Sequence, residues 1–363
     1  MKYEDQMTQR ERADAYARGE EVDRIPMGLS MNETIPNAYG ISMKDYYFSA
    51  EIQVAVEERL IREFNNDNTG LNIGLRCIGE ALGTRLAYPP DKISYVADPV
   101  LKDYSMLDHM EVCDVHKDGT LPAILEGSKI LNEKYGKERY ISIGISSPLS
   151  TAVSIRGTEA LLRDTIRNPE QLHKLLRFSC ECVVECARVF YEEAGCDVGF
   201  CEPIGAANLF SLKQCREFLV PYLEEVNRRV KQITGSAPGF HMCGRTRDRW
   251  EILRDTGIGS FSVDNCESLI EAKEVLGNTL PISGNVPPVE VLLLGTPDRV
   301  EAEVIRCLSE GSDSPSGYTL YGGCQMPIGT PLENIQAYFD AARKYGRGAK
   351  KGRLCKGLES VMK

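Results

Sequence analysis

The chain has 363 residues, of which 42% are hydrophobic and 26% are charged, the ordinary composition of a globular protein. Its net charge of −10 argues against a nucleic-acid partner, because nucleic-acid-binding surfaces are basic. No run of about 18 apolar residues is present, so we expect no transmembrane helix and no membrane partner.

The N-terminal segment is polar and is predicted to be helical. It lacks the apolar stretch of a secretory signal peptide. The 13 cysteines are odd in number and irregularly spaced, which does not fit a disulfide framework. We therefore expect reduced thiols and a cytoplasmic location, in a reducing or anaerobic cell.

Strand-like apolar runs alternate with amphipathic helical stretches along the chain. One helical pattern covers residues 158–195 and ends at Gly195, a residue type that favours helix C-termini. Residues 89–108 are instead predicted to be a loop insertion with short irregular elements. The expected strands are residues 24–31, 70–77, 139–147, 196–203, 236–244, 257–265, 280–286 and 317–324.

Eight strands that alternate with helices predict an α/β fold, a closed (β/α)₈ barrel of the TIM type. The sequence shows no short repeat and no linker that would divide it. We therefore expect residues 1–363 to form a single (β/α)₈ barrel domain with a short N-terminal helical segment.

A set of soft metal ligands lies near the ends of two expected strands. His241 and Cys243 alternate within GFHMCGR, so on a strand both side chains share one face. Cys324 follows the last expected strand. One imidazole and two thiolates suit Zn²⁺, and three protein ligands leave the open position of a catalytic zinc site. The alternative is chance proximity, since a free cysteine is often only a small buried apolar residue.

Further polar residues end other expected strands, where barrel enzymes build their active sites. Glu202 is a candidate fourth zinc ligand or general base, and otherwise a carboxylate at the barrel rim. Asp264 is a candidate for orienting a ligand or binding substrate, and otherwise forms a turn. Asn32 and Asn285 are candidate cofactor-binding residues, with ordinary loop roles as the alternative.

Other cysteines and histidines are predicted to be structural. Cys182 and Cys186 share one helix face without a histidine beside them, so packing is favoured over metal binding. Cys113 and His116 have a possible ligand spacing but no further ligands nearby. The sequence has no nucleophile elbow, no P-loop and no dinucleotide-binding glycine motif, which leaves metal-assisted chemistry as the best-supported class.

Four segments resemble the uroporphyrinogen decarboxylase superfamily. TQRERADAYARGEEVDRIPMG resembles the family's opening helix and first strand, and FSLKQCREFLVPYLEEV resembles its "S-P-x-x-F-x-E-F-x-x-P-Y" segment. ISSPLSTAVSIRGTEALLRDTIRNPE and the C-terminal GYTLYGGCQMPIGTPLENIQAYFDAAR resemble two further family segments. The likeness covers nearly the whole chain and implies the family's (β/α)₈ barrel.

The H-x-C and late cysteine resemble the cobamide-dependent methyltransferase branch of this superfamily. That resemblance implies zinc on His241, Cys243 and Cys324, and a corrinoid carried by a partner protein. It implies methyl transfer from the corrinoid protein to a coenzyme M-like thiol. The alternative is transfer from a methoxylated aromatic or other small donor to a Co(I) corrinoid, as in an O-demethylase of anaerobic one-carbon metabolism. Two other functions are less favoured: a uroporphyrinogen decarboxylase and a non-catalytic zinc-binding barrel. The decarboxylase would need arginines to bind the substrate carboxylates, and the segment LSMNETIPNAYG contains none.

Overall fold

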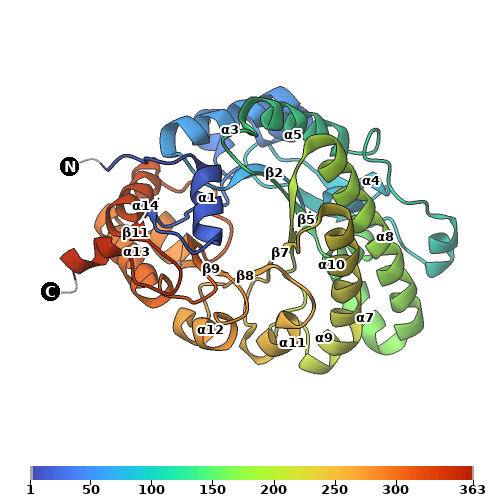
Figure 1. Cartoon of the computed structure of the whole chain (residues 1–363). Helices are drawn as coiled ribbons and strands as arrows, with labels where there is room; N and C mark the ends of the chain where they lie inside the picture. The colour runs from blue at the N-terminus through green and yellow to red at the C-terminus, as the bar shows by residue number, and fades with distance from the viewer. Residues whose placement is uncertain (1–2, 362–363) are drawn as a thin grey trace.

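The computed structural model of the chain describes residues 3–361. Figure 1 shows its helices arranged as a ring around the strands. Within the described residues, seven strands pair in parallel in the order β10-β9-β8-β7-β6-β5-β2. These strands are β2 (Thr69–Gly74), β5 (Ile141–Ser146), β6 (Asp197–Cys201), β7 (Gly239–His241), β8 (Ser260–Ser262), β9 (Ile282–Val286) and β10 (Tyr318–Gly322).

An irregular segment, residues 25–29, closes the sheet into a barrel. On one side it pairs with β10: Leu320 N–H donates to the Pro26 carbonyl at 2.9 Å, and Gly28 N–H donates to the Leu320 carbonyl at 3.0 Å. On the other side the Asn66 side chain, at the entry of β2, accepts from Leu29 N–H and donates to its carbonyl. The segment thus takes the place of the eighth strand, and the predicted (β/α)₈ barrel is confirmed.

Helices follow the strands and cover the outside of the barrel. They are α1 (Gln9–Ala17), α2 (Met43–Phe48), α3 (Ala50–Phe64), α4 (Cys77–Ala81), α5 (Leu121–Tyr135), α6 (Pro148–Arg156), α7 (Thr158–Arg167), α8 (Pro169–Ala194), α9 (Leu212–Phe218), α10 (Val220–Thr234), α11 (Trp250–Arg254), α12 (Leu269–Leu276), α13 (Pro297–Gly311) and α14 (Leu332–Tyr345). As predicted, Gly195 ends α8; its left-handed conformation, with φ of 63°, suits glycine.

Two features differ from the sequence-based expectation. The strand expected at 24–31 is an irregular segment with one parallel bridge, from Met27 to Leu320. The regular strand β1 (Val22–Arg24) lies before it and pairs antiparallel with β11 (Arg347–Ala349). The expected loop insertion contains β4 (Tyr95–Asp98), which forms an antiparallel hairpin with β3 (Arg85–Ala87) just before the insertion. Both strand pairs are too short for a strong periodic pattern, and the hairpin is interrupted by two prolines.

Helix α1 lies across the N-terminal end of the barrel (Figure 1). Its residues contact chain segments that enter strands on opposite sides of the sheet. Arg10 N–H donates to the Glu138 carbonyl before β5, and the Tyr16 hydroxyl accepts from Tyr318 N–H at the start of β10. The short N-terminal helical segment predicted from the sequence therefore closes this end of the barrel.

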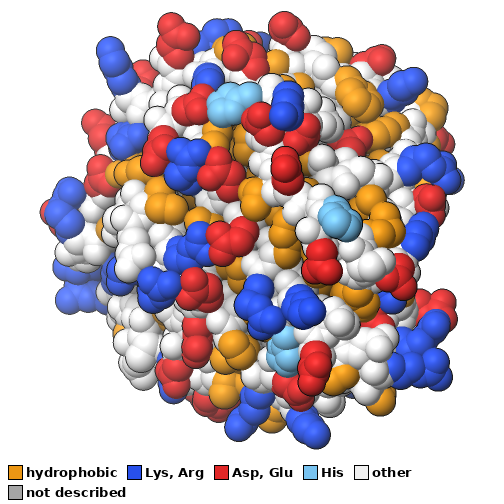
Figure 2. Space-filling view, turned by 90° about the vertical axis from the view of Figure 1, so that its right-hand side faces the viewer, with side chains coloured by type: hydrophobic (Ala, Val, Ile, Leu, Met, Phe, Trp, Pro, Cys, Tyr) orange, Lys and Arg blue, Asp and Glu red, His pale blue; other side chains and the backbone are white. Residues whose placement is uncertain are grey.

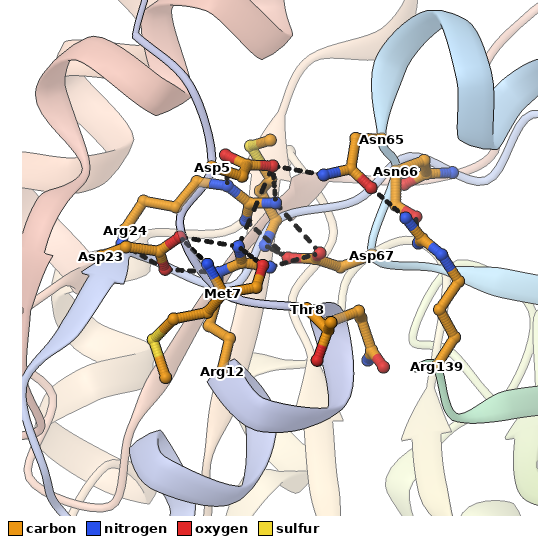
Figure 3. A network of polar contacts seen from close by, with 12 residues as sticks. Asp5, Met7, Thr8, Arg12, Asp23, Arg24, Asn65, Asn66, Asp67 and Arg139 are labelled. Atoms are coloured by element: carbon orange, nitrogen blue, oxygen red, sulfur yellow. Dashed lines mark hydrogen bonds and ion pairs between the residues drawn. The ribbon is translucent and has the colours of Figure 1, made fainter. Parts of the chain in front are cut away.

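A buried ionic cluster fixes α1 and β1 to the entry of β2 (Figure 3). The Arg24 guanidinium pairs with Asp5 at 2.7 Å and with Asp67 at 2.6 Å. Arg12 pairs with Asp23 at 2.7 Å and with Asp67 at 3.0 Å. The Arg12 and Arg24 side chains are only 1% and 2% exposed. Because water cannot solvate these buried charges, the arginines and the carboxylates must neutralise one another.

Two acidic members of this cluster, Asp5 and Asp23, have lowered pKa values. Burial by itself raises the pKa of Asp5, but the hydrogen bonds and charge of Arg24, with the charges of Arg343 and Arg12, lower that pKa far below its usual range. The cluster therefore binds the N-terminal segment with paired charges rather than with neutral hydrogen bonds.

The outer surface mixes charges of both signs. Figure 2 shows acidic and basic side chains interspersed over the face that carries α8 and α10. Several of them form pairs between neighbouring helices, such as Arg229 with Glu181 at 2.6 Å. Among the helices in residues 3–361, none combines the length and the apolar character needed to cross a bilayer.

The ionic cluster predicts a large stability loss from one substitution. In Arg24→Gln, Asp5 and Asp67 would stay buried with only Arg343 and Arg12 left to compensate their charges. We expect the free energy of unfolding at pH 7 to fall by about 3–5 kcal/mol, measured by urea denaturation. Arg18→Gln is the matched control, because Arg18 pairs with Glu20 on the surface, where the two side chains are 60% and 54% exposed. It should leave the urea unfolding midpoint nearly unchanged, because exposed ion pairs add little to stability. Equal losses in the two variants would contradict a stabilising role for the cluster.

Candidate metal centre

The register of neighbouring strands places three polar side chains on one level of the barrel. Cys201 at the end of β6 is paired with His241 of β7, and His241 is paired with Ser262 of β8. In parallel strands paired residues point to the same side, so these three side chains line the C-terminal mouth together. Each follows a buried phenylalanine, residues 200, 240 and 261, which points to the other side.

The metal ligands predicted from the sequence come together around Cys243. Its sulfur lies 3.1 Å from His241 Nε2 and 3.5 Å from the Cys324 sulfur. Two overlapping sets of potential ligands have their donor atoms within 4.8 Å of one another. One set is Cys201, His241 and Cys243, and the other is Cys243, Asp264 and Cys324.

The donor chemistry and the spacing fit zinc. With zinc–sulfur bonds of about 2.3 Å and zinc–nitrogen bonds of about 2.0 Å, tetrahedral ligands lie roughly 3.5–3.8 Å apart. The two measured separations, 3.1 and 3.5 Å, need only small shifts to reach those values. Sulfur and imidazole donors favour zinc over magnesium or calcium, which prefer oxygen.

The two predicted cysteine ligands are protonated when no metal is present. Contact with the Cys201 thiol raises the pKa of Cys243, and burial adds to this effect. Contact with Cys243 raises the pKa of Cys324, again reinforced by burial. A metal that binds here must displace these protons, so its affinity falls as the pH falls.

Neighbouring groups orient the ligand side chains. Ser262 Oγ lies 3.0 Å from His241 Nδ1, which directs the other ring nitrogen, Nε2, toward Cys243. Asp264 accepts a hydrogen bond from Gly244 N–H at 2.8 Å and so fixes the turn that follows Cys243. Gly244 has a φ of 81°, which glycine adopts without strain. Asp264, predicted to orient a ligand or bind substrate, thus lies beside both thiols and holds the backbone that follows Cys243.

Close backbone packing brings Cys324 to the group. A side chain at Gly323 would place its Cβ 2.5 Å from the backbone nitrogen of Asn265, in the loop after β8. Only glycine allows this approach. The loop that carries Asp264 can therefore lie directly against the turn that carries Cys324.

Glu202 is not brought into either set of potential ligands. It is completely buried, and its carboxylate accepts five hydrogen bonds. Three come from the start of α6: the Ser147 hydroxyl, Ser150 N–H at 3.1 Å and the Ser150 hydroxyl at 2.9 Å. Two come from the loop after β6: the Ile204 and Gly205 amides at 2.7 and 2.9 Å. Burial raises its pKa, and these donors only partly offset that effect. The structure places Glu202 as an anchor that joins the loop after β6 to the start of α6. A role as zinc ligand or general base stays a prediction.

The two predicted cofactor-binding residues also have structural partners. Asn32 donates to the Gly70 carbonyl at 2.9 Å. Asn285 donates to the Glu267 carbonyl at 2.9 Å and accepts from Arg306 at 3.0 Å. Both asparagines are buried at the ends of their segments, where they join adjacent loops. Their contact with a cofactor stays a prediction.

Sequence reasoning missed two members of the site, Cys201 and Ser262. Both end their strands at the level of His241, but that level depends on strand register, which the sequence does not give. The available signal was the shared spacing: Cys201 follows Phe200 as His241 follows Phe240.

Known proteins of similar sequence and structure support the family resemblance. The family model of uroporphyrinogen decarboxylase (URO-D) matches residues 8–345. The methylcobamide:CoM methyltransferase MtaA of Methanosarcina barkeri is 26% identical over 336 residues, which cover 90% of this chain and 95% of that protein. The methylated-thiol–coenzyme M methyltransferase of Methanosarcina mazei is 23% identical over 345 residues, 93% of this chain and 90% of that protein. A solved structure described as a methyltransferase from Methanosarcina mazei has a TM-score of 0.81 and 24% identity, and the match covers 94% of this chain and 99% of that chain.

The hydrogen bonds of Glu202 predict the effect of a nearly isosteric change. In Glu202→Gln the amide group must face at least one backbone N–H that now donates to the carboxylate. Leaving a buried N–H unpaired should lower the free energy of unfolding by about 1–3 kcal/mol, measured by urea denaturation, while the metal content stays unchanged.

Glu217→Gln is the control for this change, because Glu217 is exposed on α9. It should leave stability within about 0.5 kcal/mol of the parent. A Glu202→Gln variant as stable as this control would contradict the anchoring role, and loss of the metal would return Glu202 to the ligand set.

Proposed function

Since the chain belongs to the uroporphyrinogen decarboxylase family, we propose that it is a corrinoid-dependent methyltransferase that uses zinc. It moves a methyl group from a corrinoid carried by a partner protein to a small thiol of the coenzyme M type. The observation that carries the proposal is the contact of His241 and Cys324 with one thiol, Cys243, at the barrel mouth. Relatives named for transfer to coenzyme M align along at least nine-tenths of their own length.

The chemistry needs a thiolate at neutral pH. When bound, zinc supplies a Lewis acid that stabilises the substrate sulfur as a thiolate. The substrate sulfur then takes the methyl group of the methylated corrinoid, and the electron pair of the broken carbon–cobalt bond stays with the corrinoid as Co(I). The cobalt chemistry belongs to the corrinoid substrate, and the barrel supplies position and charge.

The residues of this chain have separate tasks in the proposed reaction. His241, Cys243 and Cys324 hold the metal with soft donors. Ser262 fixes the ring of His241, and Asp264 fixes the turn after Cys243. The ligands lie at the C-terminal end of the strands, where barrel enzymes bind their substrates.

A decarboxylase acting on a polycarboxylate is less well supported. Such a substrate needs unpaired guanidinium groups at the barrel mouth. Arg76, which follows β2, is instead paired with Glu33 at 3.3 Å and donates to the Ser94 hydroxyl at 3.1 Å. Its charge is therefore largely compensated within the protein.

Metal analysis tests the ligand assignment. Purified protein should contain about one zinc ion per chain, and Cys243→Ala or Cys324→Ala should lose most of it, because each removes a donor from a three-ligand site. Cys266→Ala is the control: Cys266 is an exposed thiol after β8 that belongs to neither set of potential ligands. Full zinc occupancy in both ligand variants would show that the metal, if present, binds elsewhere.

Methyl transfer from free methylcobalamin tests the reaction. A thiol such as coenzyme M should remove the methyl group at a rate proportional to enzyme, followed by the change in cobalamin absorbance. The rate should fall after zinc is removed and should fall as the pH drops, because protons compete with zinc for sulfur. Turnover with a methoxylated aromatic and Co(I) cobalamin, and with no thiol, would reverse the proposed direction of transfer.

A further inference from the structure

Cys201 has a position at the centre that the proposed three-ligand site does not use. Its thiol is within 4.8 Å of the donor atoms of His241 and Cys243. It points to the same side of the sheet as His241, its paired residue on the next strand. It is also partly exposed at the barrel mouth, whereas most cysteines of the described chain are buried.

The backbone of Cys201 is held on both sides. It pairs with Ser146 of β5 on one side and with His241 on the other. Its carbonyl accepts from Ser147 N–H at 3.0 Å, and the next residue, Glu202, is anchored by five hydrogen bonds. With the Cα atom fixed, the thiol moves mainly by rotation about its own Cα–Cβ bond, which keeps it near His241 and Cys243.

We propose that Cys201 is a third sulfur ligand of the metal in the resting protein. The resting centre then has four protein donors, one nitrogen from His241 and three sulfurs from Cys201, Cys243 and Cys324. This inference rests on the proposed zinc function and extends it. Without Cys201, the predicted three-ligand set of His241, Cys243 and Cys324 remains. Cys201 therefore occupies the fourth coordination position, for which a substrate thiol competes.

A third thiolate changes the charge of the centre. Zinc with two thiolates and one neutral imidazole is formally neutral, whereas three thiolates give a formal charge of −1. Additional negative charge donated by sulfur weakens the metal as a Lewis acid and favours soft metals further over hard ones. Cys201 therefore protects the resting site from hard ligands and from hard metals until a thiol arrives.

The number of sulfur ligands can be counted in protein loaded with Co²⁺ in place of zinc. Sulfur-to-cobalt charge-transfer absorption grows with each coordinated thiolate. In Cys201→Ser this absorption should fall by about one third, from three sulfurs to two, while about one metal ion per chain is retained. Release of zinc to a chelator should become at least about tenfold faster.

Two further variants make the result decisive. Cys266→Ser should leave absorption and zinc release unchanged, because Cys266 is outside both sets of potential ligands. Cys201→Ala should show the same loss of absorption and the same faster zinc release as Cys201→Ser. It excludes the possibility that the serine oxygen of Cys201→Ser binds the metal. Thermal melting checks that each variant folds.

Unchanged absorption and release in both Cys201 variants, together with losses in Cys243→Ser, would overturn the third-sulfur assignment and leave the proposed function standing. Parent protein that binds neither metal stoichiometrically would overturn both. These two failures are distinguishable because the second appears before any substitution is made.

Discussion

The parallel pairing of β6 with β7 and of β7 with β8 places Cys201, His241 and Ser262 on one level of the barrel. A shift of one residue in either pairing would turn a phenylalanine toward the mouth and a ligand toward the helices. The phenylalanines on the opposite side, including Phe240 and Phe261 with ring centres 6.2 Å apart, resist that shift because they are packed beneath the helices. The chemistry at the mouth thus depends on apolar packing that is not itself part of the site.

The two ends of the barrel use polar groups differently. At the N-terminal end, buried charges are paired and serve to hold α1 and β1 in place. At the C-terminal end, Glu202 and Arg249 hold loops: Arg249 is fully buried and donates to the Gly205 and Phe210 carbonyls. These anchors hold the loop after β6, so Cys201, which ends β6, has a rigid support.

The sequence predicted the barrel, and it also predicted three residues of the candidate site that lie close together in the structure. Seven of its eight expected strands are found at the expected places, because long apolar runs in a parallel sheet leave a strong pattern. His241, Cys243 and Cys324 were recognised by their chemistry, and the structure brings them together. Cys201 was missed because its role depends on register. Glu202 was predicted as a metal ligand because it ends a strand, and that role stays a prediction. Side chains alternate along a strand, and it is the neighbouring Cys201 that is grouped with His241 and Cys243.

The potential ligands come from β6, β7 and the turn after β10, segments that together span more than a hundred positions of the chain. No local folding unit contains them all, so a metal that needs them all binds the completed barrel and not its parts. By thermodynamic linkage, such a metal stabilises the native state by about 2.7 kcal/mol at a free concentration a hundredfold above its dissociation constant. The remaining free thiols oppose this gain, since an unfolded chain with 13 cysteines also offers sulfur to the metal. Correct assembly therefore depends on the order of two events. The barrel must close before the metal binds, because the thiols that form the site can also bind metal in the unfolded chain.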